Sequence, residues 1–492
     1  MISAAERRFF VALGTVLSTV MYTIDTTIVN VALPHMQGTL QATQDQISWV
    51  ITSYIVASAV STPLAGWLGM RFGLRPVLGI AVAGFTVSSV LCGVANGLTE
   101  VVLARILQGI FGAAVVPLAQ VALLQEYPQE KHGKVMALWS LGVMVGPVIG
   151  PTLGGWLTDE LSWRWAFFIN LPVGVASFFA VMRGLSRSHD ATRARPFDWT
   201  GFVLLSLSLA LFQLMLDRGH SQDWFSSAEI VAEAFLAVVF VYMFIVHMLT
   251  APHPFVDPSL FRDRNFVIAT VLMFMIGLTM LSPTVLMPSF MQSIQGYTAT
   301  EAGSIQASRG FGAVAAVLIA GRLTGHVSPR IIIGMGLAAA IVSLLMLGGI
   351  SVDASPQFVW LTGFVNGIGT PSIFVPLSVV AYASLRADQR AEAGAMLTLL
   401  RTIGSSIGIS ICVALIAHST QVNQSYLSEL FTPYSTNRWQ ALGFEPGPDI
   451  GTTHLVSEIT RQAAAIAYAN AFYLLAFATV AVAPLVWFVR RR

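Results

Sequence analysis

The stretch GWLGMRFGLRP, residues 66–76, decides the fold because a weaker copy of it, GRLTGHVSPR, occupies residues 321–330. The matched pairs are Gly66 with Gly321, Arg71 with His326, and Arg75 with Arg330. The copies are 255 residues apart, whereas six membrane helices need only about 190 residues, at roughly 20 per span plus short loops. The surplus fits two extra helices. The repeat therefore predicts two six-helix halves separated by an inserted pair.

The composition places the whole chain in a membrane. Of its 492 residues 55% are hydrophobic and only 10% are charged, whereas soluble domains carry roughly 25% charged residues. Stretches long enough to cross a bilayer as helices occur fourteen times, near 10–34, 47–68, 77–97, 100–123, 135–157, 165–185, 199–217, 227–249, 266–290, 302–323, 331–350, 357–383, 394–418 and 467–489. Barrel strands would be shorter and would alternate in polarity. We therefore expect an all-α polytopic membrane protein.

Basic residues set the expected orientation. With the N-terminus in the cytoplasm, 19 of the 26 lysines and arginines fall inside, four fall outside and three lie within spans, which follows the positive-inside rule. Both termini are then cytoplasmic, and the basic N-terminus precedes a retained first span. The expected parts are an N-terminal half (1–198), two inserted helices (199–250) and a C-terminal half (251–492). An external loop at 419–466 contains a piece with helical spacing, 453–467, that could lie on the membrane surface.

Asp25 lies inside the first apolar segment, in MYTIDTTIVNVALP, residues 21–34. An ionised carboxylate in hydrocarbon costs roughly a few kcal/mol or more, so such an acid is rarely accidental. We interpret Asp25 as a group that takes up and releases protons. The alternative is a polar residue that faces another helix or an aqueous cavity.

Arg105 is the expected partner of Asp25. Asp25 lies about six residues before the outer end of the first span and Arg105 about five residues into the fourth, so at 1.5 Å per residue both lie roughly 8–9 Å below the outer surface. They can pair if the two spans adjoin. Arginine favours the charged acid and burial favours the neutral acid, which would let Asp25 exchange its proton near physiological pH. A static ion pair is the alternative.

Glycines predict close helix contacts in three places. In the fourth span, Arg105, Gln108 or Gly109, and Gly112 share one face at helical spacing. In the fifth span glycines recur every four residues beside two prolines, which allows close packing and kinks the helix. These residues are Gly142, Gly146, Gly150 and Gly154, with Pro147 and Pro151. Packing alone and a hinge or seal between the halves are both compatible with this stripe.

The third place is the repeated loop, which combines Gly66 and Gly73 with Arg71 and Arg75. Its arginines are either a positive-inside anchor or part of a gate that latches the halves together when the protein is open outward.

A substrate cavity is expected between the halves. Its candidate residues are Gln108, Met273, Phe274, Arg309 and Arg401. Methionines and phenylalanines could adapt to varied apolar ligands, although lipid contact or core packing is the simpler explanation, and Arg401 could snorkel to the surface. No Walker A motif, metal-ligand cluster, nucleophile elbow or ion-channel filter occurs in the sequence. ATP drive, metal binding and the common enzyme classes are therefore not indicated, and the two cysteines imply no disulfide framework.

Taken together, these motifs resemble the EmrB/QacA-type drug:proton antiporters of the major facilitator superfamily, in the fourteen-span branch. The resemblance is carried by DTTIVNVALP (25–34), LARILQGIFGAA (103–114), GVMVGPVIGPTLGGWL (142–157), residues 66–76, and LDRGHSQDWFSSAEI (216–230). One departure is Met70, where the loop motif usually has an acid, so a charge latch here would need other groups.

The resemblance implies proton-driven export of lipophilic drugs across a cell inner membrane, without a cofactor, with Asp25 as the coupling acid. It also implies an EmrA-like periplasmic adaptor and a TolC-like outer-membrane channel if the cell is Gram-negative. The alternatives are a substrate-specific exporter of a metabolite or siderophore, an importer, and a membrane protein that transports nothing. The fold alone does not separate them.

Overall fold

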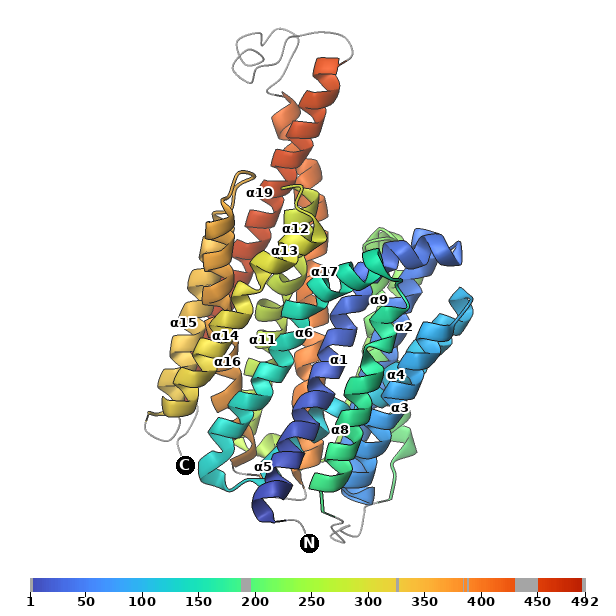
Figure 1. Ribbon diagram of the computed structural model, residues 1–492, viewed down its shortest axis with the longest axis vertical. Helices are drawn as coiled ribbons and strands as arrows, with labels where there is room; N and C mark the ends of the chain where they lie inside the picture. Colours follow the sequence, from blue (N-terminus) through green and yellow to red (C-terminus); the bar gives the residue numbers. More distant parts are fainter. Residues whose placement is uncertain are drawn as a thin grey trace.

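The computed structural model describes residues 3–186, 196–323, 327–383, 385–386, 389–429 and 450–488. His326 of the repeat, the basic residues at 187–195 and 490–492, and the middle of the expected external loop lie outside these ranges. The described elements are helices stacked side by side in one elongated bundle (Figure 1).

The N-terminal half contains eight α-helices and one short 3₁₀ helix. They are α1 (Ala4–Leu40), α2 (Gln44–Phe72), α3 (Leu74–Val94), α4 (Leu98–Gly112), α5 (Val115–Glu126), η1 (Gln129–Lys131), α6 (His132–Glu160), α7 (Trp165–Phe168) and α8 (Asn170–Gly184). Capping boxes start α1 and α2: the Ser3 and Thr43 hydroxyls accept from the backbone N–H of Glu6 and Gln46, whose side chains reach back to the cap. Gly73 joins α2 to α3 at φ 85°, a left-handed conformation that favours glycine.

The rest of the chain supplies the inserted pair and the C-terminal half. The inserted segment comprises α9 (Trp199–Arg218), η2 (Trp224–Ser226) and α10 (Ala228–Thr250). The later elements are η3 (Pro258–Arg262), α11 (Arg264–Ile276), the π-helical η4 (Gly277–Leu281), α12 (Ser282–Ser293), α13 (Ala299–Gln306), α14 (Ser308–Leu323), α15 (Pro329–Gly348), α16 (Pro356–Ala383), α17 (Arg390–Glu429), α19 (Ile450–Val482) and η6 (Ala483–Phe488).

Thirteen helical segments in the described ranges are long and apolar enough to cross a bilayer, some of them assembled from two or three consecutive elements. The 29-residue α6 lies where the fifth span is expected. Every predicted span thus coincides with a helix, and the prediction of an all-helical membrane protein is confirmed.

The two halves meet along α2, α5 and α6 on one side and along α13, α14, α16 and α17 on the other. The inserted helix α9 lies beside this seam, against α2 and α17. Its Leu216 carbonyl accepts a hydrogen bond from Ser410 Oγ of α17 at 3.0 Å, and its Asp217 side chain bonds Thr52 of α2. The inserted pair therefore touches both halves without separating them.

The described parts of the expected external loop, 419–429 and 450–466, are helical. At 1.5 Å per residue, the 40 residues of α17 span about 60 Å, twice the thickness of a bilayer core. The end of α17 and the start of α19 project together beyond the other helices (Figure 1), and Gln424 Nε2 donates to Thr460 Oγ1 between them at 3.1 Å. The prediction of a helical piece at 453–467 is confirmed. It continues the axis of α19 and does not turn aside along a membrane surface.

Candidate functional site

Asp25 lies in α1 with none of its surface exposed. Its Oδ2 accepts a hydrogen bond from Arg105 Nη1 of α4 at 2.7 Å. Its Oδ1 accepts two more at 2.8 Å, from Gln108 Nε2 of α4 and from Asn170 Nδ2 of α8. Three helices thus converge on one carboxylate, and the predicted pairing of Asp25 with Arg105 is confirmed.

The guanidinium of Arg105 also has several hydrogen-bond partners. It is 1% exposed, its Nε donates to the Val50 carbonyl at 3.1 Å, and its Nη1 also donates to Gln108 Oε1 at 2.7 Å. The guanidinium carbon lies 4.0 Å from the centroid of the Tyr54 ring, a cation–π arrangement. Gln108 therefore bridges the pair, since it accepts from Arg105 and donates to Asp25.

A second layer holds Asn170 in place. Its Nδ2 also donates to Ser89 Oγ of α3 at 2.9 Å, and that hydroxyl donates to the Phe167 carbonyl at 2.9 Å. Neither Asn170, Ser89 nor Tyr54 was predicted to belong to this site. Asn170 carried a usable signal, because it lies about five residues into the sixth span and so at the depth of Arg105.

The hydrogen bonds around Asp25 depend on whether its carboxylate carries a proton. A buried ion pair is stable only when its hydrogen bonds are complete, and loss of one charge leaves the other uncompensated. Protonation of Asp25 would remove the negative charge that Arg105 faces and convert one carboxylate oxygen into a donor. The hydrogen bonds that join α1 to α4 and α8 are therefore sensitive to the protonation state of Asp25.

The glycine stripe of α6 positions α1, the helix that carries Asp25. A Cβ added to Gly146 would lie 2.3 Å from the Thr23 backbone, and one added to Gly154 would lie 2.8 Å from Ile28. Thr27 Oγ1 donates to the Gly146 carbonyl at 3.0 Å. Gly142 and Gly150 meet α1 in the same way, at Val16 and Thr27. The stripe thus packs within one half, so the suggestion that it seals the two halves against each other is wrong in this structure.

α6 also meets the C-terminal half, at α13, α14 and α16. A Cβ on Gly303 of α13 would lie 2.2 Å from Thr152 Oγ1, and the Trp139 ring stacks on Phe374 of α16 with centroids 5.6 Å apart. The helix is continuous through positions 147 and 151, although the side chains of Pro147 and Pro151 lie outside the described set. α6 therefore links the Asp25 site to the interface, and its role as a hinge stays a prediction.

We predict that Gly146→Ala destabilises the protein by about 1–3 kcal/mol, because the added methyl group meets backbone atoms of α1 that have no room to move. Gly38→Ala is the matched control in α1 itself, since a Cβ there meets nothing within 4 Å. Chemical denaturation in mixed micelles measures both. Equal stability of the two variants would contradict the close packing of α1 on α6.

Gly66 of the repeated loop brings the N-terminal half close to the C-terminal half at one end of their interface. A Cβ on Gly66 would lie 2.8 Å from Glu392 Cα of α17, and one on Gly69 would lie 3.5 Å from Ala391 Cβ. Arg71 is exposed and Arg75 half-buried, and within the described ranges neither forms an ion pair. In this structure the loop thus joins the halves by backbone approach at Gly66, and its arginines do not form a charge latch.

Of the five residues predicted for the substrate cavity, one lines a small cavity between the halves, of about 10 Å³. That cavity is bounded by Ser140, Val143 and Met144 of α6, Ile276, Leu281, Thr370 and Phe374, and Arg401 of α17. Gln108 instead belongs to the Asp25 site, and Met273 is buried in the apolar core. The Phe274 carbonyl packs against Gly404, and Arg309 donates to the Met280 carbonyl at 2.7 Å.

The family model of the major facilitator superfamily matches residues 15–409, more than three quarters of the chain. The chain belongs to the major facilitator superfamily. It is 34% identical to the multidrug export protein EmrB of Haemophilus influenzae over 480 residues, which cover 96% of this chain and 94% of that protein. It is equally similar, at 34%, to EmrB of Escherichia coli over 96% of this chain and 94% of that one.

A third relative is the fatty acid resistance protein FarB of Neisseria gonorrhoeae. It is 34% identical over 98% of this chain and 96% of that protein. Among solved structures, the human organic anion transporter MFSD10 superposes with a TM-score of 0.59 at 13% identity, covering 97% of this chain and all of that one. At that identity the likeness shows the fold alone. The resemblance to EmrB-like major facilitator transporters inferred from the motifs is confirmed.

Proposed function

We propose that this chain is a proton-coupled multidrug efflux transporter that works by alternating access. The observation that carries the proposal is the buried carboxylate of Asp25, held by Arg105, Gln108 and Asn170 inside a bundle with few other acids. Similarity to proteins named multidrug export proteins supports the direction and the cargo. The proposal includes fourteen spans arranged as 6+2+6, cytoplasmic termini, an inner-membrane location and protons as the only driving agent.

In the proposed cycle, Asp25 takes up a proton from the periplasmic side and loses it to the cytoplasm. Charged Asp25 holds Arg105 and so favours one packing of α1 against α4 and α8, whereas neutral Asp25 releases it. Drug and proton then stabilise different arrangements of the halves, which is what exchange requires. A proton that crosses about 150 mV supplies about 3.5 kcal/mol.

Transport by the purified protein in proteoliposomes tests this function. An imposed pH gradient is expected to drive accumulation of a lipophilic dye against its own gradient, and an uncoupler is expected to abolish it. A sodium gradient of the same size at equal pH serves as the control. Accumulation that follows the sodium gradient and ignores the proton gradient would overturn the proposal.

Arg401 supports a preference for weakly acidic lipophiles. It lines the cavity between the halves, 5.8 Å from the Phe374 ring, and within the described ranges it has no hydrogen bond or ion pair. Arg309 is also buried, at 5% exposure, and bonds a carbonyl and a hydroxyl but no acid. An uncompensated cation in an apolar interior attracts an anion, and the relative FarB is named for fatty acid resistance.

We predict that Arg401→Gln weakens transport of a lipophilic carboxylate about tenfold, because a charged hydrogen bond to the substrate is lost, and that it leaves transport of a neutral dye nearly unchanged. Arg461→Gln is the control, since Arg461 bonds the Ile294 carbonyl away from this cavity. Export of the neutral dye measures transport of that substrate, and inhibition of dye export by the carboxylate measures binding of the other, in each variant. Equal loss for the two substrate classes would refute the preference.

We further propose that the projecting ends of α17 and α19 bind an EmrA-like periplasmic adaptor, which would deliver substrate to a TolC-like outer-membrane channel. Tyr426 of this projection is 66% exposed. A photo-crosslinker at position 426 is expected to capture the adaptor in cells that contain one. The same group at Phe477, 67% exposed in the apolar part of α19, is expected not to. Capture at 477 alone would place the adaptor elsewhere.

A further inference from the structure

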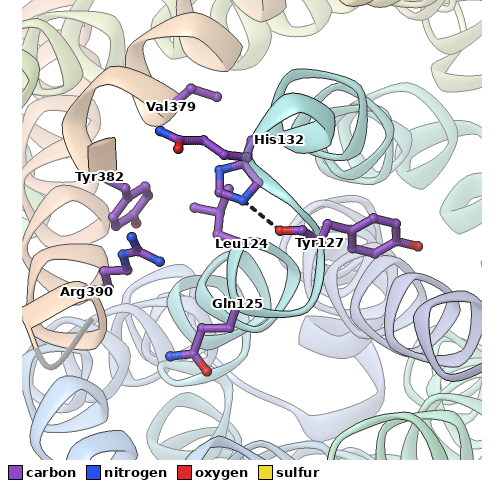
Figure 2. A pocket seen from close by; sticks show the side chains of 8 residues that line it. Leu124, Gln125, Tyr127, His132, Val379, Tyr382 and Arg390 are labelled. Carbon is purple, nitrogen blue, oxygen red and sulfur yellow. Dashed lines mark hydrogen bonds between the residues drawn. The ribbon is translucent and has the colours of Figure 1, made fainter. Parts of the chain in front are cut away.

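A cavity of about 260 Å³ opens between the two halves at the end of the bundle where α1 begins. It is lined from the N-terminal half by Leu124, Gln125, Tyr127, Gln129 and His132, and from the C-terminal half by Val379, Tyr382 and Arg390. Figure 2 shows Arg390 and Tyr382 on one side of it and His132 on the other, with the Tyr127 ring directed away. One water needs only about 15 Å³, so the cavity has room for a ligand of several heavy atoms.

The described residues that line the cavity are rich in donors and include no acid. Arg390 Nε is buried and has no hydrogen-bond partner among the described residues. His132 Nε2–H donates to the Tyr127 carbonyl at 2.9 Å (Figure 2), so its other ring nitrogen donates to an oxyanion only when the ring is doubly protonated. The Tyr382 hydroxyl is committed to Gln120 Oε1 at 3.3 Å. A guanidinium with an unpartnered buried Nε–H, in a partly enclosed space, is a suitable partner for an oxyanion.

We propose that this cavity binds a phosphate-type oxyanion, held mainly by Arg390 and assisted by the amides of Gln125 and Gln129, and by His132 in its doubly protonated form. Guanidinium groups bind phosphate oxygens in pairs, so Arg390 supplies both charge and orientation. The same chemistry would serve free phosphate from the solvent or the phosphate of an anionic lipid headgroup.

A bound oxyanion would connect the halves. His132 begins α6 and Arg390 begins α17, and a close backbone approach between the halves at this end, Gly66 on Glu392, lies two residues along α17 from Arg390. The ligand would therefore stabilise the arrangement in which this end of the interface is closed. This role does not depend on which substrate is exported or on proton coupling.

The test measures thermal stability of the full chain in nanodiscs. In phosphatidylcholine discs, inorganic phosphate is titrated against chloride at constant ionic strength. In a second arm, phosphatidylglycerol replaces part of the lipid and phosphate is left out. Arg390→Gln is expected to weaken the apparent Kd about tenfold, and Arg390→Lys is expected to retain most of the effect.

Lys134→Gln is the matched control, because Lys134 is an exposed cation two residues beyond His132 on α6 and does not line the cavity. Gln129→Leu is the second variant if Arg390→Gln fails to fold. Stabilisation by phosphate in phosphatidylcholine discs identifies the ligand as a free anion, and stabilisation by phosphatidylglycerol alone identifies it as a headgroup. The proposal is overturned if neither arm stabilises the wild type, or if Lys134→Gln removes the effect as fully as Arg390→Gln does.

Discussion

Asp25→Asn is expected to reduce proton-driven drug accumulation from about 300-fold to no accumulation. The first figure is the gradient that about 3.5 kcal/mol sustains, at about 1.4 kcal/mol per factor of ten. Asparagine matches aspartate in size and can still accept from Gln108 and Asn170, but it cannot exchange a proton. Downhill counterflow of drug is expected to persist, because Arg105 keeps the Val50 carbonyl and the Tyr54 ring.

Glu233→Gln is the control for this prediction. Glu233 is another buried acid, 8% exposed, but it lies in α10 of the inserted pair, 4.0 Å from Arg218. Its neutralisation is expected to leave accumulation nearly intact. Uphill transport by Asp25→Asn, measured in proteoliposomes with an imposed pH gradient, would remove Asp25 from the coupling step.

Arg105→Ala is expected to destabilise the protein by about 3–5 kcal/mol, the usual cost of breaking a buried ion pair from one side. It leaves Asp25 without its cation, and it also removes a donor from Gln108 and from the Val50 carbonyl. Chemical denaturation in mixed micelles measures the loss. Arg164→Ala is the control, because Arg164 is half-exposed, donates to the Ala95 carbonyl at 2.9 Å and lies over the Trp163 ring at 4.4 Å, with no acid bonded to it among the described residues, so about 1 kcal/mol is expected.

A double variant separates the ion pair from general damage to packing. If Asp25 is the charge that Arg105 compensates, then Asp25→Asn in the Arg105→Ala background restores part of the lost stability, and the two changes are not additive. Strict additivity of the two free-energy changes would mean that the pair contributes nothing beyond its separate contacts.

Periodicity and depth sufficed to predict the bundle and its central pair. Each predicted span coincides with a helix. Asp25 and Arg105 lie at equal depth in the membrane, which allows their side chains to pair, and they do so. The face of α4 was also predictable: Arg105, Gln108, Gly109 and Gly112 are all buried, and Gly109 lies against the Tyr54 carbonyl of α2.

The sequence did not reveal which helix or residue each predicted group contacts. A glycine stripe shows that some helix comes close but not which one, so the contact of α6 with α1 emerged only from the structure. Gln108 was predicted to line the cavity because helical spacing shows on which side of a helix a residue lies, but not which residue it contacts. Met273 was assigned there because flexible apolar side chains serve cores and ligand sites alike. The projection of α17 and α19 was hidden because helices beyond a bilayer are not marked by hydropathy.

The central claim is that drug binding and protonation of Asp25 exclude each other. Linkage requires that a ligand favouring the charged form expel the proton. Purified protein in an unbuffered detergent solution with a pH indicator, titrated with drug near the midpoint of Asp25 protonation, measures this directly. Since about half of the molecules carry the proton at that midpoint, the account predicts release of up to about half a proton per protein from the wild type and none from Asp25→Asn. Equal release from both, or drug binding to the wild type with no release at any pH, would contradict it.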